Sequence, residues 1–117
     1  MQRSYQDLGV WRKAIDLVEA VYRATQGWPK EELYGLTNQV RRAAVSVPAN
    51  VTEGQGQYSP KEFLHHLAIA NGSLCEVEAH LVIARRLGYT DEATHKALGQ
   101  QAAEVGRLLH GLMRSLR

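Results

Sequence analysis

The chain has 117 residues, of which 44% are apolar and 22% charged, and its formal net charge is +2 with a pI near 8.9. A chain of this length forms one domain with a real core, and its composition excludes an intrinsically disordered protein. The small positive charge permits nucleic-acid binding without arguing strongly for it, so the placement of the charges matters more than their sum.

The sequence also bears on the cellular compartment. No apolar run approaches the ~20 residues of a membrane span, and the start MQRSYQDLGVW lacks the apolar segment of a signal peptide. The single cysteine, Cys75, cannot form an internal disulfide, and we expect it to be a small buried apolar residue. We therefore expect a reduced cytoplasmic protein without membrane contact, in which the sequon Asn50-Val51-Thr52 is a chance match.

The first predicted helix spans about residues 7–26. Its apolar side chains recur in alternating steps of three and four, which places them on one helix face. Asp7 is a plausible N-cap, and Gly27-Trp28-Pro29 ends the helix because the residue before a proline avoids helical angles. The expected buried stripe is Leu8, Trp11, Ile15, Val18, Tyr22 and Thr25.

The second predicted helix spans about residues 31–55 and contains the unusual segment RRAAVSVPANVTEG (41–54). The acids Glu31 and Glu32 suit a leading turn, and the glycines Gly54 and Gly56 suit a helix end. Pro48 lacks a backbone N–H and crowds a carbonyl of the preceding turn, so we expect a kink there. The expected buried stripe is Leu36, Val40, Ala43, Val47, Asn50 and Gly54.

Polar residues form a second stripe on this helix, at the edge of the apolar one. Ser46 and Asn50 can hydrogen-bond to the backbone that a proline loosens. In an antiparallel bundle Arg42 approaches Glu76 on the third helix or Glu19 on the first, and a partly buried arginine needs such a partner. We interpret the stripe as a structural polar seam that sets the register of the helices, in preference to a ligand site. The polar seam comprises Arg42, Ser46, Pro48, Asn50, Glu53 and Glu76.

The third predicted helix spans about residues 60–87. Ser59-Pro60-Lys61-Glu62 is a capping box with proline at the first helical position. Gly88 closes the helix, and Tyr89 can supply the hydrophobic contact that accompanies such a cap. The expected buried stripe is Phe63, Leu67, Ala70, Leu74, Val77, Leu81 and Ala84.

The fourth predicted helix spans about residues 91–116 and starts at Thr90 or Asp91. Its expected buried stripe is Leu98, Ala102, Val105, Leu109, Leu112 and Leu116. The short connections make successive helices antiparallel neighbours. The sequence therefore predicts an all-α, up-down-up-down antiparallel four-helix bundle as a single domain over residues 1–117, with the second helix kinked near Pro48.

A surplus of apolar residues lies beside the four stripes. These residues are Leu33, Leu64, Ile69, Val82, Ile83, Leu87, Leu108 and Met113. They widen the apolar face of each helix, which indicates either a homo-oligomer or a thick core.

The bundle fold raises the question of a di-metal carboxylate site. Such a site needs a Glu-x-x-His motif on each of two helices, and the chain has two matches, Glu62 to His65 and Glu92 to His95. Each match lies in the first turn of its own helix, and antiparallel neighbours start at opposite ends, roughly 40 Å apart for 27 residues. We expect no metal, no cofactor and no enzymatic activity.

One end of the predicted bundle collects basic residues. This end combines the start of the first and third helices with the end of the second and fourth. Its basic residues are Arg3, Arg12, Lys13, Lys61, Arg107, Arg114 and Arg117, against Asp7, Glu53, Glu62 and Glu104. We take Arg12, Lys13, Lys61, Arg107, Arg114 and Arg117 as candidate nucleic-acid contacts. The alternative for Arg114 and Arg117 is that they only complement the dipole at a helix C-terminus.

Five segments together resemble a known family. They are LGVW (8–11), YGLTNQ (34–39), RRAAVSVPAN (41–50), EG (53–54) and ANGSLCE (70–76). They resemble the bacterial four-helix-bundle proteins related to the 23S rRNA intervening-sequence protein. The resemblance implies a small cytoplasmic homopentamer without enzymatic activity, and some family members are encoded inside intervening sequences of 23S rRNA genes.

The same resemblance implies candidate partners. Related members are accessory proteins of diversity-generating retroelements, which bind a reverse transcriptase and nucleic acid. We therefore predict a non-enzymatic oligomeric scaffold that binds RNA or DNA through the basic end, with a reverse transcriptase as a further candidate partner. The alternative is a protein–protein interaction module that does not bind nucleic acid.

Overall fold

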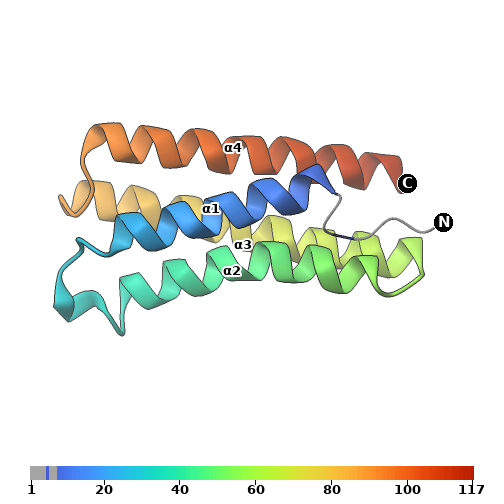
Figure 1. Cartoon of the computed structure of the whole chain (residues 1–117), viewed down its shortest axis with the longest axis horizontal. Helices are drawn as coiled ribbons and strands as arrows, with labels where there is room; N and C mark the ends of the chain where they lie inside the picture. The colour runs from blue at the N-terminus through green and yellow to red at the C-terminus, as the bar shows by residue number, and fades with distance from the viewer. Residues whose placement is uncertain (1–4, 6–7) are drawn as a thin grey trace.

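The computed structural model describes Tyr5 and residues 8–117. Across these residues it has no strand, and the predicted helices form an up-down-up-down bundle, which confirms the predicted fold class (Figure 1). The elements are α1 (Gly9–Thr25), the short 3₁₀ helix η2 (Lys30–Glu32), α2 (Leu36–Gln55), α3 (Pro60–Arg86) and α4 (Glu92–Ser115). The predicted Asp7 cap and Arg3 lie outside the described residues.

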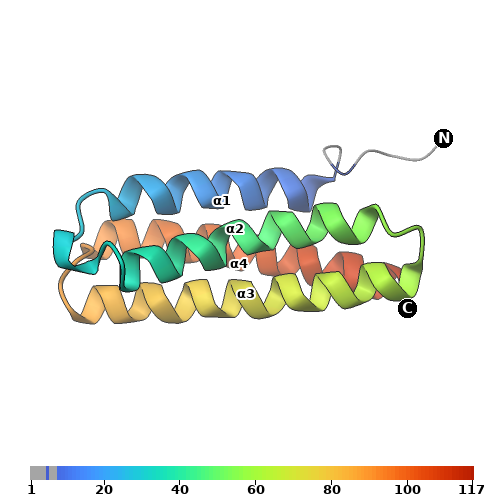
Figure 2. The ribbon, with the colours of Figure 1, turned by 90° about the horizontal axis from the view of Figure 1, so that it is seen from below.

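Each helix packs against two neighbours. α1 contacts α2 and α4, and α3 also contacts α2 and α4, with the most extensive packing between α2 and α3 (Figure 2). The start of α1, the end of α2, the start of α3 and the end of α4 share one end of the bundle (Figure 1). This is the arrangement that the sequence predicted for the basic end.

The predicted helix boundaries of α3 and α4 agree with the structure. Ser59 Oγ accepts the backbone N–H of Glu62 at 3.3 Å, with Pro60 as the first helical residue. Asp91, not Thr90, caps α4 and accepts the N–H of Thr94 at 2.7 Å. Side-chain capping satisfies N–H groups that have no partner within the helix, so these boundaries are local in origin.

The end of α3 also closes as predicted. Gly88 has φ +79°, a left-handed conformation that suits glycine, and the N–H of Tyr89 donates to the carbonyl of Ala84 at 2.9 Å. The Tyr89 ring then lies 6.0 Å from the ring of Trp28, centroid to centroid, so the chain that leaves α3 packs onto the α1–α2 connection.

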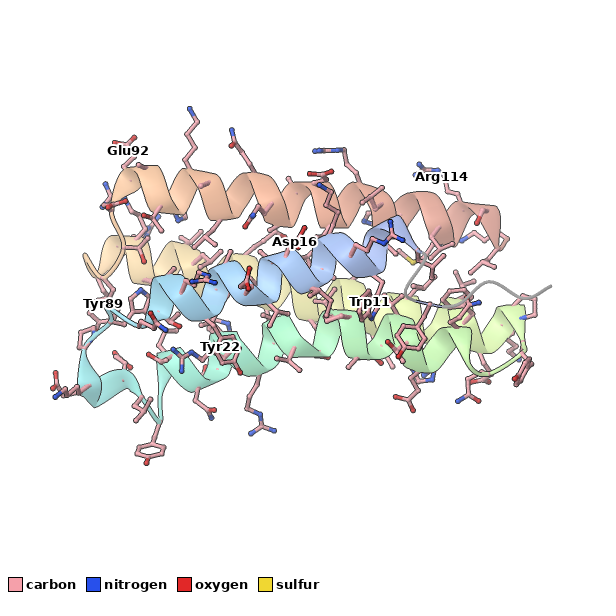
Figure 3. The ribbon with its side chains drawn as sticks, viewed as in Figure 1. Trp11, Asp16, Tyr22, Tyr89, Glu92 and Arg114 are labelled. Atoms are coloured by element: carbon pink, nitrogen blue, oxygen red, sulfur yellow. The ribbon has the colours of Figure 1, made fainter. Side chains whose placement is uncertain are left out.

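The predicted buried face of α1 is correct only in part: Thr25 is buried, and Leu8, Trp11 and Val18 are partly buried against the core. The predicted residues Ile15 and Tyr22 are 39% and 41% exposed. The bulky residues cover the edge between α1 and α2, where Trp11 Nε1 donates to Thr52 Oγ1 at 3.0 Å (Figure 3). The face that points into the core is instead set by neighbouring positions along the helix, and Leu17 and Val21 are among the largest fully buried side chains. The buried residues of α1 are Val10, Ala14, Leu17, Val21 and Thr25.

The buried stripes of the other helices agree closely with the prediction. In α3 the core positions run from Leu67 to Ala84 as predicted, with Phe63 partly buried. In α4 Met113 is buried, while the predicted Leu112 and Leu116 are only partly buried. This shift follows from the mismatch between a strict seven-residue repeat and 3.6 residues per helical turn.

The connection between α1 and α2 differs from the prediction. The second helix starts at Leu36, five residues later than expected, after the 3₁₀ turn that contains Glu31 and Glu32. Glu32 accepts two hydrogen bonds, from the Leu36 N–H at 3.1 Å and from the Tyr89 hydroxyl at 2.8 Å. It therefore caps α2 and ties the α1–α2 connection to the turn between α3 and α4 (Figure 3).

Gly54 has a different role from the predicted helix stop. It is buried inside α2, which continues to Gln55. A Cβ atom at this position would lie 2.8 Å from Phe63 Cδ1 and 2.9 Å from His66 Cβ. Only glycine lets the end of α2 approach α3 this closely, so Gly54 serves packing and Gly56 forms the C-cap.

α3 is more apolar than the sequence pattern indicated. By length and composition alone it is the one helix among the described residues that could cross a membrane, and 39% of its apolar window is buried in the bundle. The core helix of a helical bundle passes the same test of length and composition.

The close approach at Gly54 predicts a marked effect of a single methyl group. Gly54→Ala should lower the free energy of unfolding by about 1–3 kcal/mol, because the methyl overpacks the contact with Phe63 and His66. Gly99→Ala is the matched control: it lies within α4 with nothing within 4 Å of a new Cβ, and should raise stability by about 0.5–1 kcal/mol. Urea unfolding measures both changes, and equal effects would contradict this role for Gly54.

The Glu32 cap predicts a pH-dependent stability difference. The Tyr89 hydroxyl and the Leu36 N–H lower the pKa of Glu32, so its carboxylate stabilises the fold above the unfolded-state pKa of about 4.3. This contribution is lost as pH falls through the folded-state pKa. Glu32→Gln should therefore be less stable than the parent at pH 7, and the gap should close toward pH 3. Urea unfolding across this range tests it, with the adjacent exposed Glu31→Gln as a control that should show no such gap.

Candidate functional site

The polar seam is a hydrogen-bonded chain between α2 and α3. Ser46 Oγ lies 2.8 Å from Ser73 Oγ on the facing helix. The amide nitrogen of Asn50 donates to the Ser46 carbonyl at 2.8 Å and to Ser46 Oγ at 3.0 Å. The Asn50 side chain thus hydrogen-bonds to the backbone near Pro48, but its acceptor is the Ser46 carbonyl and not the Ala44 carbonyl that Pro48 leaves without its N–H donor. α2 continues as a helix through the buried Pro48.

His66 completes the chain on α3. Its Nδ1 lies 3.2 Å from Asn50 Oδ1. Because the Asn50 amide nitrogen faces a carbonyl oxygen, its Oδ1 must face the histidine, so the ring Nδ1–H is the donor. Sequence reasoning missed both His66 and Ser73. The expected approach of Arg42 to Glu76 contained the signal for Ser73: Ser46 is one turn further along α2, which on the antiparallel α3 lies about one turn before Glu76, beside Ser73.

The predicted ion pair of Arg42 is wrong. Arg42 is exposed and forms no ion pair with any described residue, while Glu19 pairs with Arg23 at 3.5 Å. The neighbouring Arg41 points toward α1 instead. Its Nε donates to Thr25 Oγ1 at 2.8 Å, and its guanidinium lies 4.6 Å from the centre of the Tyr22 ring.

Glu53 and Glu76, the two acidic residues of the predicted seam, also make no ion pair with Arg42. Glu53 is exposed and makes no ion pair within the described part of the chain. Arg42 and Glu76 stand on the two sides of a shallow groove between α2 and α3, with the two serines between them. One residue changes direction by 100° on a helix, so a small error of register exchanges Arg41 for Arg42.

The two Glu-x-x-His motifs do not form a metal site. They start α3 and α4 and so lie at opposite ends of the bundle (Figure 1). Among the described residues no three His, Cys, Asp or Glu side chains come close enough to hold a metal ion. The rejection of this pair on topological grounds therefore agrees with the arrangement of the helices.

The candidate nucleic-acid contacts lie in the half of the bundle where the predicted basic end was placed. Lys13 pairs with Glu104 at 3.7 Å, which reduces the charge available to a ligand. Arg107 and Arg114 form no ion pair within the described region, and Arg114 projects from the outer side of α4 (Figure 3). All six candidates, Arg12, Lys13, Lys61, Arg107, Arg114 and Arg117, are exposed.

A groove between α3 and α4, the α3–α4 groove, brings several of these groups together. Its volume is ≈ 570 Å³. Cys75 lines it and is exposed, so the prediction of a buried cysteine is wrong. Sequence reasoning failed here because Cys75 lies one residue beyond the core position Leu74. The groove is lined by Asn71, Leu74, Cys75, Glu78, Ala102, Ala103, Gly106, Arg107, His110 and Arg114.

The outer face of α3 is apolar and exposed. Of the predicted surplus apolar residues, Met113 is in the core and Leu64 is partly buried. Ile69, Val82 and Ile83 on α3 are 40%, 46% and 45% exposed. The other exposed members of the surplus are Leu33, Leu87 and Leu108.

Comparisons with known proteins agree with this fold. A family model described as 23S rRNA-intervening sequence protein matches residues 6–111. A similar solved structure is the crystal structure of a protein of unknown function from the S23 ribosomal protein family of Bacteroides thetaiotaomicron VPI-5482, with a TM-score of 0.83. It is 21% identical, and the match covers 90% of this chain and 95% of that chain, so the likeness shows the fold. No functionally curated protein matches.

The polar seam predicts a measurable coupling between two helices. Asn50→Leu and His66→Leu should each leave a folded bundle and cost about 1–3 kcal/mol, because each leaves a partner without its hydrogen bond. The double variant should cost about 0.5–1.5 kcal/mol less than the sum of the two. Urea unfolding of the four proteins gives this coupling. Strict additivity would contradict the contact, and a folded Asn50→Leu protein with the assembly intact but ligand binding lost would make the seam a ligand site.

Proposed function

The protein belongs to the 23S rRNA-intervening sequence protein family, and on that premise we propose that it is a non-enzymatic cytoplasmic scaffold that self-associates and binds RNA or DNA. The observation that carries the proposal is the separation of two surfaces on neighbouring helices. The outer face of α3 is apolar, whereas the outer face of α4 carries unpaired arginines.

The outer face of α3 supports self-association. Ile69, Gly72, Glu76, Ala79 and Ile83 are all exposed and follow one another at intervals of three and four residues. This is the spacing at which one helix presents a continuous stripe to another. Gly72 and Ala79 would let a second helix approach closely, and the isoleucines at both ends supply apolar area. The carboxylate of Glu76 lies at the centre of the stripe and would need a polar partner in such a contact. A second copy of the chain is the proposed partner, and we propose a homopentamer because the family resemblance implies one.

The arginines of α4 support nucleic-acid binding. Arg107 and Arg114 have no acidic partner among the described residues, so their charges are available to phosphates. A ring of five copies would repeat this patch five times, which multiplies a modest positive potential.

A second candidate function rests on the opposite end of the bundle. Tyr34 is 91% exposed, and Leu33 and Leu87 are about half exposed. Exposed tyrosine beside aliphatic side chains is typical of protein-binding surfaces. This end favours a protein-interaction module, and a reverse transcriptase is the candidate partner that the resemblance supplies.

Size-exclusion chromatography with light scattering, with and without a short RNA, tests the assembly and the ligand together. We expect a particle of five times the 13.1 kDa chain mass that gains mass with RNA at low salt and loses this gain as salt rises. Ile83→Glu should dissociate the particle and keep the helical circular dichroism, whereas Ile15→Glu, equally exposed on α1, should leave it intact.

Self-association and nucleic-acid binding are each contradicted by a different experimental result. A parent protein that is monomeric at all concentrations rules out self-association. An oligomer that takes up no RNA or DNA at low salt rules out the nucleic-acid role and leaves the protein-interaction module.

A further inference from the structure

The floor of the α3–α4 groove is open because small residues form it. Ala102, Ala103 and Gly106 line the α4 side. A Cβ atom on Gly106 would lie 3.4 Å from Leu74 Cδ2, so the two helices approach closely at this level. The residues that line the groove extend from this level in both directions, and Arg114 marks its extent toward the end of the bundle that holds the start of α3.

The α4 wall of the groove is cationic. Arg107, His110 and Arg114 follow one another at intervals of three and four residues, which places them on one side of the helix. The two arginines are separated by about 10 Å along the axis, at ~1.5 Å per residue. Neither arginine pairs with an acid in the described region.

One acid, Glu78, also lines the groove. Leu74 lies opposite Gly106, so Glu78 is one turn from this level in one direction and Arg114 is two turns in the other. Twelve residues at ~1.5 Å give an axial separation of roughly 18 Å between the Glu78 and Arg114 positions. Arg114 therefore lies far from Glu78, whereas Arg107 is about 7 to 8 Å from Glu78 along the axis, at ~1.5 Å for each of five residues.

The α3 wall opposite the arginines offers neutral groups. Asn71 supplies an amide that can donate to an oxygen, and Cys75 supplies a thiol. Guanidinium groups match the geometry of phosphate oxygens and bind them in pairs. A volume of ≈ 570 Å³ falls within the range of about 300–1,000 Å³ for ligand pockets, so the groove can hold more than a bare ion.

We propose that the α3–α4 groove binds the phosphate of a nucleotide, with Arg107, His110 and Arg114 as its ligands and Asn71 on the facing wall. The nucleotide is either free or part of a strand. This inference rests on the proposed nucleic-acid role and places it in the groove, away from Arg12, Lys13 and Lys61.

The single cysteine provides a direct reporter of the groove. Cys75 is exposed and lines it, so a bound ligand should shield its thiol. The experiment measures the rate at which N-ethylmaleimide modifies Cys75 in the full chain, by mass spectrometry, with no ligand, with AMP, and with a ten-nucleotide oligouridine. We expect the oligonucleotide to slow the reaction at least fivefold, and AMP to slow it if the free nucleotide is the ligand.

Two double variants with the same loss of charge complete the test. Arg107→Ala/Arg114→Ala should abolish the shielding and weaken oligonucleotide binding at least tenfold. Lys30→Ala/Lys96→Ala removes two exposed cations outside the groove and should change neither result. If Cys75 of the free protein proves unreactive, the affinities of these two variants decide the question, with equal affinities overturning the inference.

The remaining outcomes distinguish a failure of the groove inference from a failure of the proposed nucleic-acid role. An oligonucleotide that binds without shielding Cys75, and equally well to both double variants, overturns the groove and leaves nucleic-acid binding elsewhere. Shielding by AMP without oligonucleotide binding supports the groove and overturns the nucleic-acid role. A protein that binds neither ligand overturns both.

Discussion

The close packing of α2 against α3 is the constraint on which the other features depend. Gly54 lets the two backbones approach, and the hydrogen bonds from Ser46 to Ser73 and from His66 to Asn50 are satisfied in one register only. A slip of one residue would break both hydrogen bonds and would push a side chain into the space beside Phe63. This register sets which face of α3 points into the core and which points outward.

The outer surfaces follow from that orientation. With Leu67 and Leu74 in the core, α3 must direct Ile69 and Ile83 outward, and α4 directs Arg107 and Arg114 outward beside it. The proposed self-association and the proposed phosphate site thus lie on adjacent helices. The α3–α4 groove runs along the border between them, so the assembly would repeat each groove next to a subunit contact. One helix pair would then serve both assembly and ligand binding.

The end of the bundle that holds the α1–α2 and α3–α4 connections is stabilised by a different set of contacts. The Glu32 carboxylate holds the start of α2 and the hydroxyl of Tyr89 together, while Trp28 Nε1 donates to the buried Thr90 Oγ1 at 3.1 Å. These contacts join the two connections at that end without a disulfide or a metal. Tyr34 at the same end is 91% exposed, and this exposure is the feature that favours a protein partner there.

The sequence by itself determined the features that depend on near neighbours along the chain. The Ser59 cap, the left-handed Gly88 and the repeat from Leu67 to Ala84 follow from hydrogen bonds and periodicity within one helix, whereas the start of α4 stayed open between Thr90 and Asp91. Only the tertiary structure decided which of two rival faces α1 buries, that Arg41 and not Arg42 reaches α1, and that Cys75 is exposed. These outcomes depend on the rotation of one helix against another. Turning a helix by 100° about its axis moves one residue to the place of the next. Local hydrogen bonds and apolar spacing do not distinguish two orientations that differ by a single residue.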